Sequence, residues 1–168
     1  MKELKDTLWK AADKLRGSMD ASQYKDVILG LVFLKYVSDA FDEHREQIRA
    51  ELEADGLNED QIAQLIDDVD EYTGRGVFWV GARARWMFLA ENAKGLPAER
   101  GEASKSIGLL IDEAMGLISG DNPTLAGSLP RIYNRDNVDQ RRLGELLDLL
   151  NSAPVSYTHL TLPTILLV

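Results

Sequence analysis

The hydrophobic positions between residues 4 and 41 form two helical repeats separated by a polar turn. Gly17 and Ser18 loosen the end of the first repeat. Asp20 followed by Gln23 predicts a capping box, in which an acceptor side chain satisfies a free N–H at the start of the next helix. The first repeat advances in steps of three and four residues, which places one helical face at Leu4, Leu8, Ala12, Leu15 and Met19.

The second helix is apolar around most of its circumference. A helix of this kind packs against several neighbours, so we expect it to be central, with Leu31 and Leu34 among the most buried residues. Its apolar run over residues 27–34 is much shorter than the roughly 18–20 residues of a membrane span, and Lys25 and Lys35 flank it. One face carries Tyr24, Val27, Ile28, Leu31, Leu34, Val37 and Phe41, and much of the remainder carries Leu29, Val32, Phe33 and Tyr36.

A narrower apolar stripe continues this helix past Phe41 to a predicted C-cap at Gly56. Asn58 and Gln61 predict a second capping box. A short amphipathic helix through Ile62, Leu65, Ile66 and Val69 is then expected, ended by Gly74 and Gly76.

Two further helices are predicted towards the C-terminus. They are separated by a long loop in which Asn122-Pro123 and Pro130 mark turns. The sequence therefore predicts an all-α fold, a compact bundle of about six to seven helices. The apolar positions of the two helices are Ile107, Leu110, Ile111, Ala114, Met115 and Ile118 in the first, and Leu143, Leu146, Leu147 and Leu150 in the second.

Composition fits one domain of ordinary size with a real core, because the chain has 168 residues of which 45% are hydrophobic. Cysteine is absent, which excludes disulfides and thiolate metal sites and favours a reducing cytoplasm. The N-terminus has no apolar core of a signal peptide. A formal net charge of −9 argues against an independent, non-specific DNA binder, since such proteins are usually basic.

The tail from Pro154 onward differs abruptly from the rest, since it has no charged residue in a chain that is 28% charged. Alternating Thr and Leu has β-propensity, so a terminal strand is one interpretation. We favour another, because VSYTHLTLPT resembles a translated transposase sequencing adapter. In one frame that adapter encodes residues 155–164, an index accounts for residues 165–167, and the adapter then encodes Val168 and a stop codon. We therefore expect a domain at 1–153 and a non-native tail at 154–168, with His159 not functional.

The segment LWKAADKLRGSMDASQYKDVILGLVFLKYVSDAF, residues 8–41, resembles the N-terminal helical region of the modification (M) subunits of type I restriction–modification systems. Residues 107–133 also match this family, which has Asn-Pro-x-Leu, Leu-Pro and a Tyr in similar positions. Around residue 81 the family often carries a proline and then Ala-Arg-Trp. Arg85 and Trp86 fit that pattern, whereas Gly81 departs from it. The resemblance covers roughly residues 4–152.

The resemblance implies an adenine-specific DNA methyltransferase as the full-length protein. It would transfer a methyl group from S-adenosylmethionine to adenine N6 in a bipartite target that a specificity (S) subunit reads. It implies further partners: DNA, a second M subunit, and a restriction (R) subunit where one is present. The N-terminal domain would contact partner subunits and help to close the assembly around DNA. The alternative is a non-enzymatic helical protein-interaction domain.

The catalytic motifs of this family are missing from the chain. Such enzymes need a Gly-rich loop after a strand for the cofactor and an Asn-Pro-Pro-aromatic motif for the flipped adenine. Asn122-Pro123-Thr124 lacks the second proline and the aromatic residue, so we interpret it as a turn. The Gly74–Gly76 segment lacks a third glycine and a preceding strand. We therefore predict no catalytic or cofactor-binding residue here, and an isolated chain that is inactive and binds no cofactor.

Other candidate chemistry is sparse. Asp67, Asp68 and Asp70 lack the spacing of a calcium loop, so we expect no metal site, and His44 lies in an acidic helix with no catalytic partner. Arginines can contact phosphates, although solvated arginines are the more common case. The candidate DNA or partner contacts are Arg83, Arg85, Trp86, Arg131 and Arg135.

Overall fold

The computed structural model describes residues 19–151 together with Asp6, Lys10 and Asp13. The predicted first helix, with its stripe from Leu4 to Leu15, and the tail from 154 to 168 lie outside the described residues.

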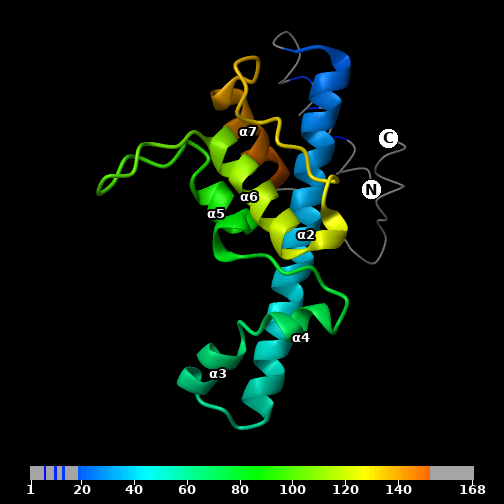
Figure 1. Ribbon diagram of the computed structural model, residues 1–168, viewed down its shortest axis with the longest axis vertical. Coiled ribbons are helices and arrows are strands. Elements are labelled where there is room, and N and C mark those ends of the chain that lie inside the picture. The colour runs from blue at the N-terminus through cyan, green and yellow to red at the C-terminus, as the bar shows by residue number, and fades with distance from the viewer. Residues whose placement is uncertain (1–5, 7–9, 11–12, 14–18, 152–168) are drawn as a thin grey trace.

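A single long helix, α2 (Ala21–Ala54), runs through the whole described structure (Figure 1). Its start is the predicted capping box: the Asp20 carboxylate accepts from the Gln23 N–H at 3.0 Å, and the Gln23 side chain accepts from the Asp20 N–H at 3.3 Å. The helix ends at Ala54 with Asp55 as its C-cap, and Gly56 follows with φ of +84°, a conformation that favours glycine. The predicted start is confirmed, and the C-cap lies one residue before the predicted Gly56.

The remaining helices are shorter, and the described part of the chain contains six α-helices and no strand. The prediction of an all-α fold is therefore confirmed. Two isolated β-bridges, Leu96 with Lys105 and Glu99 with Glu102, close a narrow loop that projects from the helices (Figure 1). The other elements are α3 (Glu59–Leu65), α4 (Val69–Thr73), α5 (Trp86–Glu91), α6 (Ile107–Asp121) and α7 (Gln140–Asn151), with 3-10 helices η1 (Ala82–Ala84) and η2 (Pro123–Leu125).

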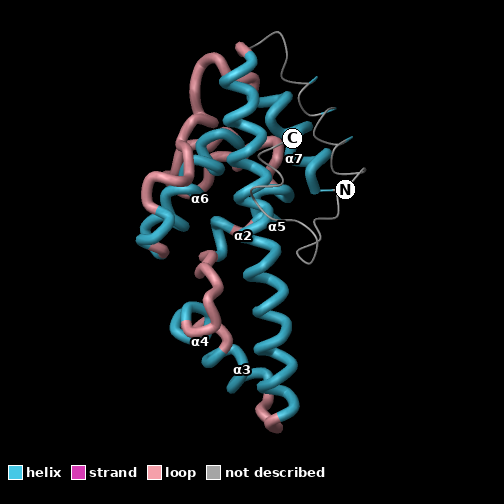
Figure 2. Tube along the Cα trace, turned by 90° about the vertical axis from the view of Figure 1, so that its right-hand side faces the viewer, coloured by secondary structure: helices cyan, strands magenta, loops and turns pink. Residues whose placement is uncertain are grey.

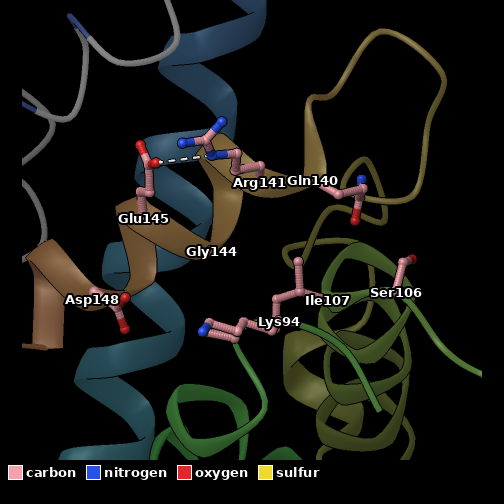
Figure 3. A pocket seen from close by; sticks show the side chains of 9 residues that line it. Lys94, Ser106, Ile107, Gln140, Arg141, Gly144, Glu145 and Asp148 are labelled. Carbon is pink, nitrogen blue, oxygen red and sulfur yellow. Dashed lines mark ion pairs between the residues drawn. The ribbon is translucent and has the colours of Figure 1, made fainter. Parts of the chain in front are cut away.

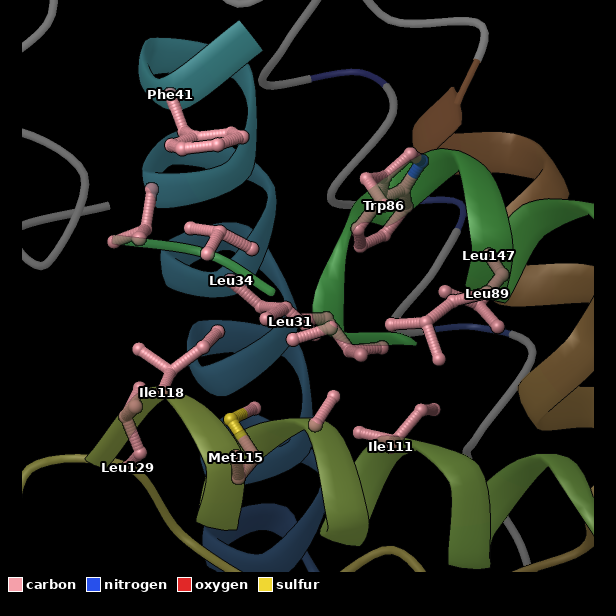
Figure 4. Close-up of a cluster of buried hydrophobic side chains, with 14 of the residues drawn as sticks. Leu31, Leu34, Phe41, Trp86, Leu89, Ile111, Met115, Ile118, Leu129 and Leu147 are labelled. Atoms are coloured by element: carbon pink, nitrogen blue, oxygen red, sulfur yellow. The ribbon is translucent and has the colours of Figure 1, made fainter. Parts of the chain in front are cut away.

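The core lies where the N-terminal half of α2 packs against α5, α6 and α7, an arrangement called the bundle below. Leu31 and Leu34 are both 0% exposed, which confirms the prediction made for them. Figure 4 shows these two side chains between α2, α5 and α6. The core residues that face them from the other helices include Trp86, Leu89, Ile111, Met115, Ile118 and Leu147.

The C-terminal half of α2 extends beyond the bundle, and α3 and α4 lie beside it (Figures 1 and 2). We call residues 42–75 the arm. Ile48, Ile62 and Ile66 give the arm a small apolar centre, with exposed fractions of 1–3%. At its base, the ring of Phe41 stacks on Tyr72 at 4.8 Å and meets Trp79 edge-on at 5.3 Å.

The prediction of one short helix through Ile62, Leu65, Ile66 and Val69 is wrong. Helix α3 ends at Leu65, and Asp68 begins α4 by accepting a hydrogen bond from the Asp70 N–H at 3.1 Å. Because two separate helices replace one, the four apolar residues do not lie on a common helical face. Ile62 and Ile66 are buried, whereas Leu65 is 46% exposed and Val69 is 39% exposed.

The loop between α6 and α7 is fixed to the bundle at several points. Tyr133 is fully buried, and its hydroxyl donates to the Val27 carbonyl at 2.8 Å. The Asp112 carboxylate accepts from the N–H groups of Tyr133 and Asn134, each at 3.1 Å. Gln140 donates to the Tyr133 carbonyl at 3.0 Å and accepts from the Gly108 N–H at 2.7 Å. The loop is therefore an integral part of the packed bundle.

Candidate functional site

Trp86 belongs to the core of the described structure. Its exposed fraction is 2%, its backbone N–H donates to the Ser38 hydroxyl at 2.7 Å, and its indole N–H donates to Asn151 at 3.0 Å. The Lys35 ammonium lies 5.5 Å from the ring centroid. These contacts join α2, α5 and α7 through one residue, and Trp86 therefore presents almost no surface to DNA or a partner.

Arg85 precedes α5 and is held at the base of the arm. Its Nε–H donates to the Val80 carbonyl at 3.1 Å, and its guanidinium lies 4.8 Å from the centre of the Phe41 ring. Burial lowers the pKa of Arg85, and the neighbouring charge of Arg45 acts in the same direction. The guanidinium stays protonated at neutral pH, because the ordinary pKa of arginine lies far above neutrality. Arg85 thus has intramolecular partners that compete with any phosphate.

Arg83, Arg131 and Arg135 are exposed. The Arg83 guanidinium lies 5.9 Å from the centre of the Phe88 ring. Arg131 reaches across the loop onto α6, where its Nη2 would lie 2.7 Å from a Cβ at Gly116. It lines an open groove of about 430 Å³ together with Lys105 and Leu117. Arg83 and Arg135 do not line this groove, so the candidate residues do not form a single site.

A second cleft, of about 460 Å³, opens between α7 and the N-terminal end of α6 (Figure 3). Its charges are mixed: Lys94 and Arg141 are cationic, Glu145 and Asp148 are anionic, and Arg141 pairs with Glu145 at 3.5 Å. No pair of side chains in it forms a nucleophile with a base. The remaining lining residues are Ala93, Ser106, Ile107, Gln140 and Gly144.

Asn122 is a buried structural residue that the sequence indicated only as part of a turn. Its side chain accepts from the Trp79 N–H at 3.0 Å and donates to the Trp79 carbonyl at 2.8 Å. Pro123 begins η2 directly after it. The interpretation of Asn122-Pro123 as a turn is confirmed. The side-chain amide of Asn122 forms hydrogen bonds with the backbone of Trp79. The sequence shows only that Asn122 precedes a proline, and this local pattern does not reveal a partner that lies 43 residues away.

Within the residues that the structure describes, no group of three or more His, Cys, Asp or Glu side chains is placed to hold a metal ion. Over the same residues, no helix combines the length and the apolar character needed to cross a membrane.

The described residues thus form an α-helical domain, and no arrangement of catalytic side chains is found among them. A family model described as the HsdM N-terminal domain matches residues 4–150. The chain therefore belongs to the HsdM N-terminal domain family, the N-terminal domain of type I restriction enzyme methylase subunits.

A curated relative with this domain is the type I restriction enzyme MjaIX methylase subunit of Methanocaldococcus jannaschii. It is 31% identical over 163 residues. The match covers 94% of this chain and 28% of the relative, so the chain spans less than a third of the length of that methylase subunit.

Proposed function

We propose that this domain serves an adenine-specific DNA methyltransferase of a type I restriction–modification system, by contacting partner subunits and helping to close the assembly around DNA. The observation that carries the proposal is the family match over residues 4–150, together with the methylase subunit that is 31% identical over 163 residues. The partners proposed are DNA, the S subunit, a second M subunit and, in systems that have one, the R subunit. The site of action proposed is the cytoplasm.

The chemistry is assigned to the part of the full-length protein that this chain does not span. S-adenosylmethionine would be the methyl donor there. The present residues do not fit that cofactor, because its loop follows a strand in this class of enzyme and the described residues contain no strand. The chain also lacks an Asn-Pro-Pro-aromatic motif for a flipped adenine.

Exposed apolar side chains support a role in subunit contact. Met87 is 57% exposed on α5 and Leu117 is 44% exposed on α6. Single exposed apolar residues are common, but these two are large and lie on helices that also form the core. Burial of such side chains by a partner would stabilise an assembly through the hydrophobic effect.

A cofactor-binding and methyl-transfer assay tests the proposal. Residues 1–153 alone should show no S-adenosylmethionine binding by calorimetry and no transfer to DNA. The full-length protein with its S subunit should show both. Transfer by residues 1–153 alone would mean that the active site is wrongly assigned, and no binding by the full-length pair would favour the non-enzymatic interaction domain.

A further inference from the structure

The negative charge of the chain is concentrated in the arm. Residues 42–75 contain 12 acidic and 3 basic side chains, a net charge of −9, which equals the net charge of the whole chain. Elsewhere 16 acidic and 16 basic residues balance. The arm is therefore strongly acidic, whereas the remainder of the sequence is balanced in charge.

The carboxylates of the arm point to solvent and exceed the cations that could neutralise them. Every acidic residue of the arm except Asp42 is exposed. The three arginines are already paired within the arm: Arg45 with Asp67, Arg49 with Glu59 at 3.1 Å, and Arg75 with Glu51 at 2.6 Å. The carboxylates that make no ion pair with another described residue include Glu43, Glu46, Asp55, Asp60 and Asp70.

An independent feature of the arm is its exposed apolar surface. Leu65 and Val69 lie four residues apart across the junction of α3 and α4, at 46% and 39% exposure. The arm extends past the bundle, so the bundle does not cover them (Figures 1 and 2). Apolar side chains within a charged surround are the usual anatomy of a protein–protein interface.

We propose that the arm docks against a basic protein surface, with Leu65 and Val69 as its apolar contacts. This inference rests on the proposed function, in which the domain works inside a DNA-binding assembly. DNA itself is a poor occupant, because its phosphates are repelled by a surface of charge −9. The arm of a second copy would be repelled for the same reason, and its bundle offers no excess of positive charge.

A subunit that reads DNA is a suitable partner by charge, because such proteins carry clustered Lys and Arg. The arm complements that surface electrostatically and adds an apolar contact that salt does not screen. Docking would place the acidic arm against protein and keep its charge away from the nucleic acid.

The test uses the full-length protein and its S subunit, with affinity measured at low and at high salt. The arm variant is Glu46→Gln, Asp60→Asn and Asp70→Asn, which removes three exposed charges that make no ion pair with another described residue. The matched control, Glu91→Gln, Asp121→Asn and Asp136→Asn, removes three exposed charges from the bundle side of the chain. At low salt the arm variant should bind about tenfold more weakly and the control less than about twofold.

A second variant, Leu65→Ser with Val69→Ser, should weaken assembly at both salt concentrations. Wild-type assembly should itself weaken with salt, a measurement that needs no variant. Equal affinities for the arm variant and the control would overturn the proposal. Unchanged assembly with tighter DNA binding by the arm variant would also overturn it, because the arm would then act by repelling DNA. Failure of the wild-type pair to assemble or to methylate would instead count against the proposed function.

Discussion

Gly30 forms a notch in α2 that admits the side chain of Tyr133. A Cβ added at Gly30 would lie 2.1 Å from the Tyr133 hydroxyl oxygen and 3.1 Å from Pro130 Cγ. Tyr133 cannot simply retreat, because it is fully buried and Asp112 holds its backbone N–H at 3.1 Å. Gly30→Ala should therefore displace the ring and break the hydroxyl's hydrogen bond to Val27.

The expected change in the free energy of unfolding is the sum of two costs and one gain. Overpacking costs about 1–3 kcal/mol, and a buried hydroxyl without a partner costs about 1–3 kcal/mol. Alanine recovers about 1 kcal/mol relative to glycine inside a helix. We expect a net loss of about 3 kcal/mol in the free energy of unfolding, measured by urea denaturation.

Two further variants make the reasoning refutable. Gly120→Ala on α6 is the control, because nothing lies within 4 Å of its added Cβ, and it should leave stability unchanged or raise it. Tyr133→Phe removes the oxygen at 2.1 Å and leaves the ring carbon Cζ at 3.3 Å, so the double variant should be more stable than Gly30→Ala alone. A Gly30→Ala protein as stable as wild type, or no rescue by Phe, would refute the account of the notch.

Three other predictions concern the core, the base of the arm and the tail. Leu31→Ala should cost roughly 2–5 kcal/mol in denaturant unfolding, and a loss below about 1 kcal/mol would contradict its central position. Burial raises the pKa of Asp42, so its charged form destabilises the fold above that pKa; Asp42→Asn should stabilise the protein at pH 7 and lose its advantage in acid, as pH-dependent unfolding would show. Resequencing the source locus across the Ala153 codon should reveal native codons in place of residues 155–168, and finding VSYTHLTLPT in the native gene would exclude an adapter origin.

Local signals in the sequence predicted where α2 and α3 begin. The capping boxes at Asp20 and Asn58 depend on residues three positions apart, so they can be read without knowledge of the fold. The burial of Leu31 and Leu34 followed from a helix apolar on most sides. The break between α3 and α4 was missed because Asp68 can either continue a helix or cap a new one, and apolar spacing alone does not distinguish the two.

Long-range contacts could not be predicted in this way. The role of Gly30 depends on Tyr133, and the hydrogen bonds of Asn122 reach Trp79, so each becomes visible only when distant segments meet. Arg85 and Trp86 appeared in the sequence as candidate contacts, whereas the structure gives both of them intramolecular partners. The exposed arginines Arg83, Arg131 and Arg135 stay predictions, because solvated and ligand-binding arginines look alike in an isolated chain.

The central claim is that this domain serves an adenine methyltransferase. Methylation-sensitive sequencing of DNA from a host that expresses the full-length protein with its S subunit tests it most directly. The account predicts N6-methylated adenine at one split target, and loss of that modification when residues 1–153 are deleted. An intact, expressed pair that leaves the host adenines unmodified would contradict it.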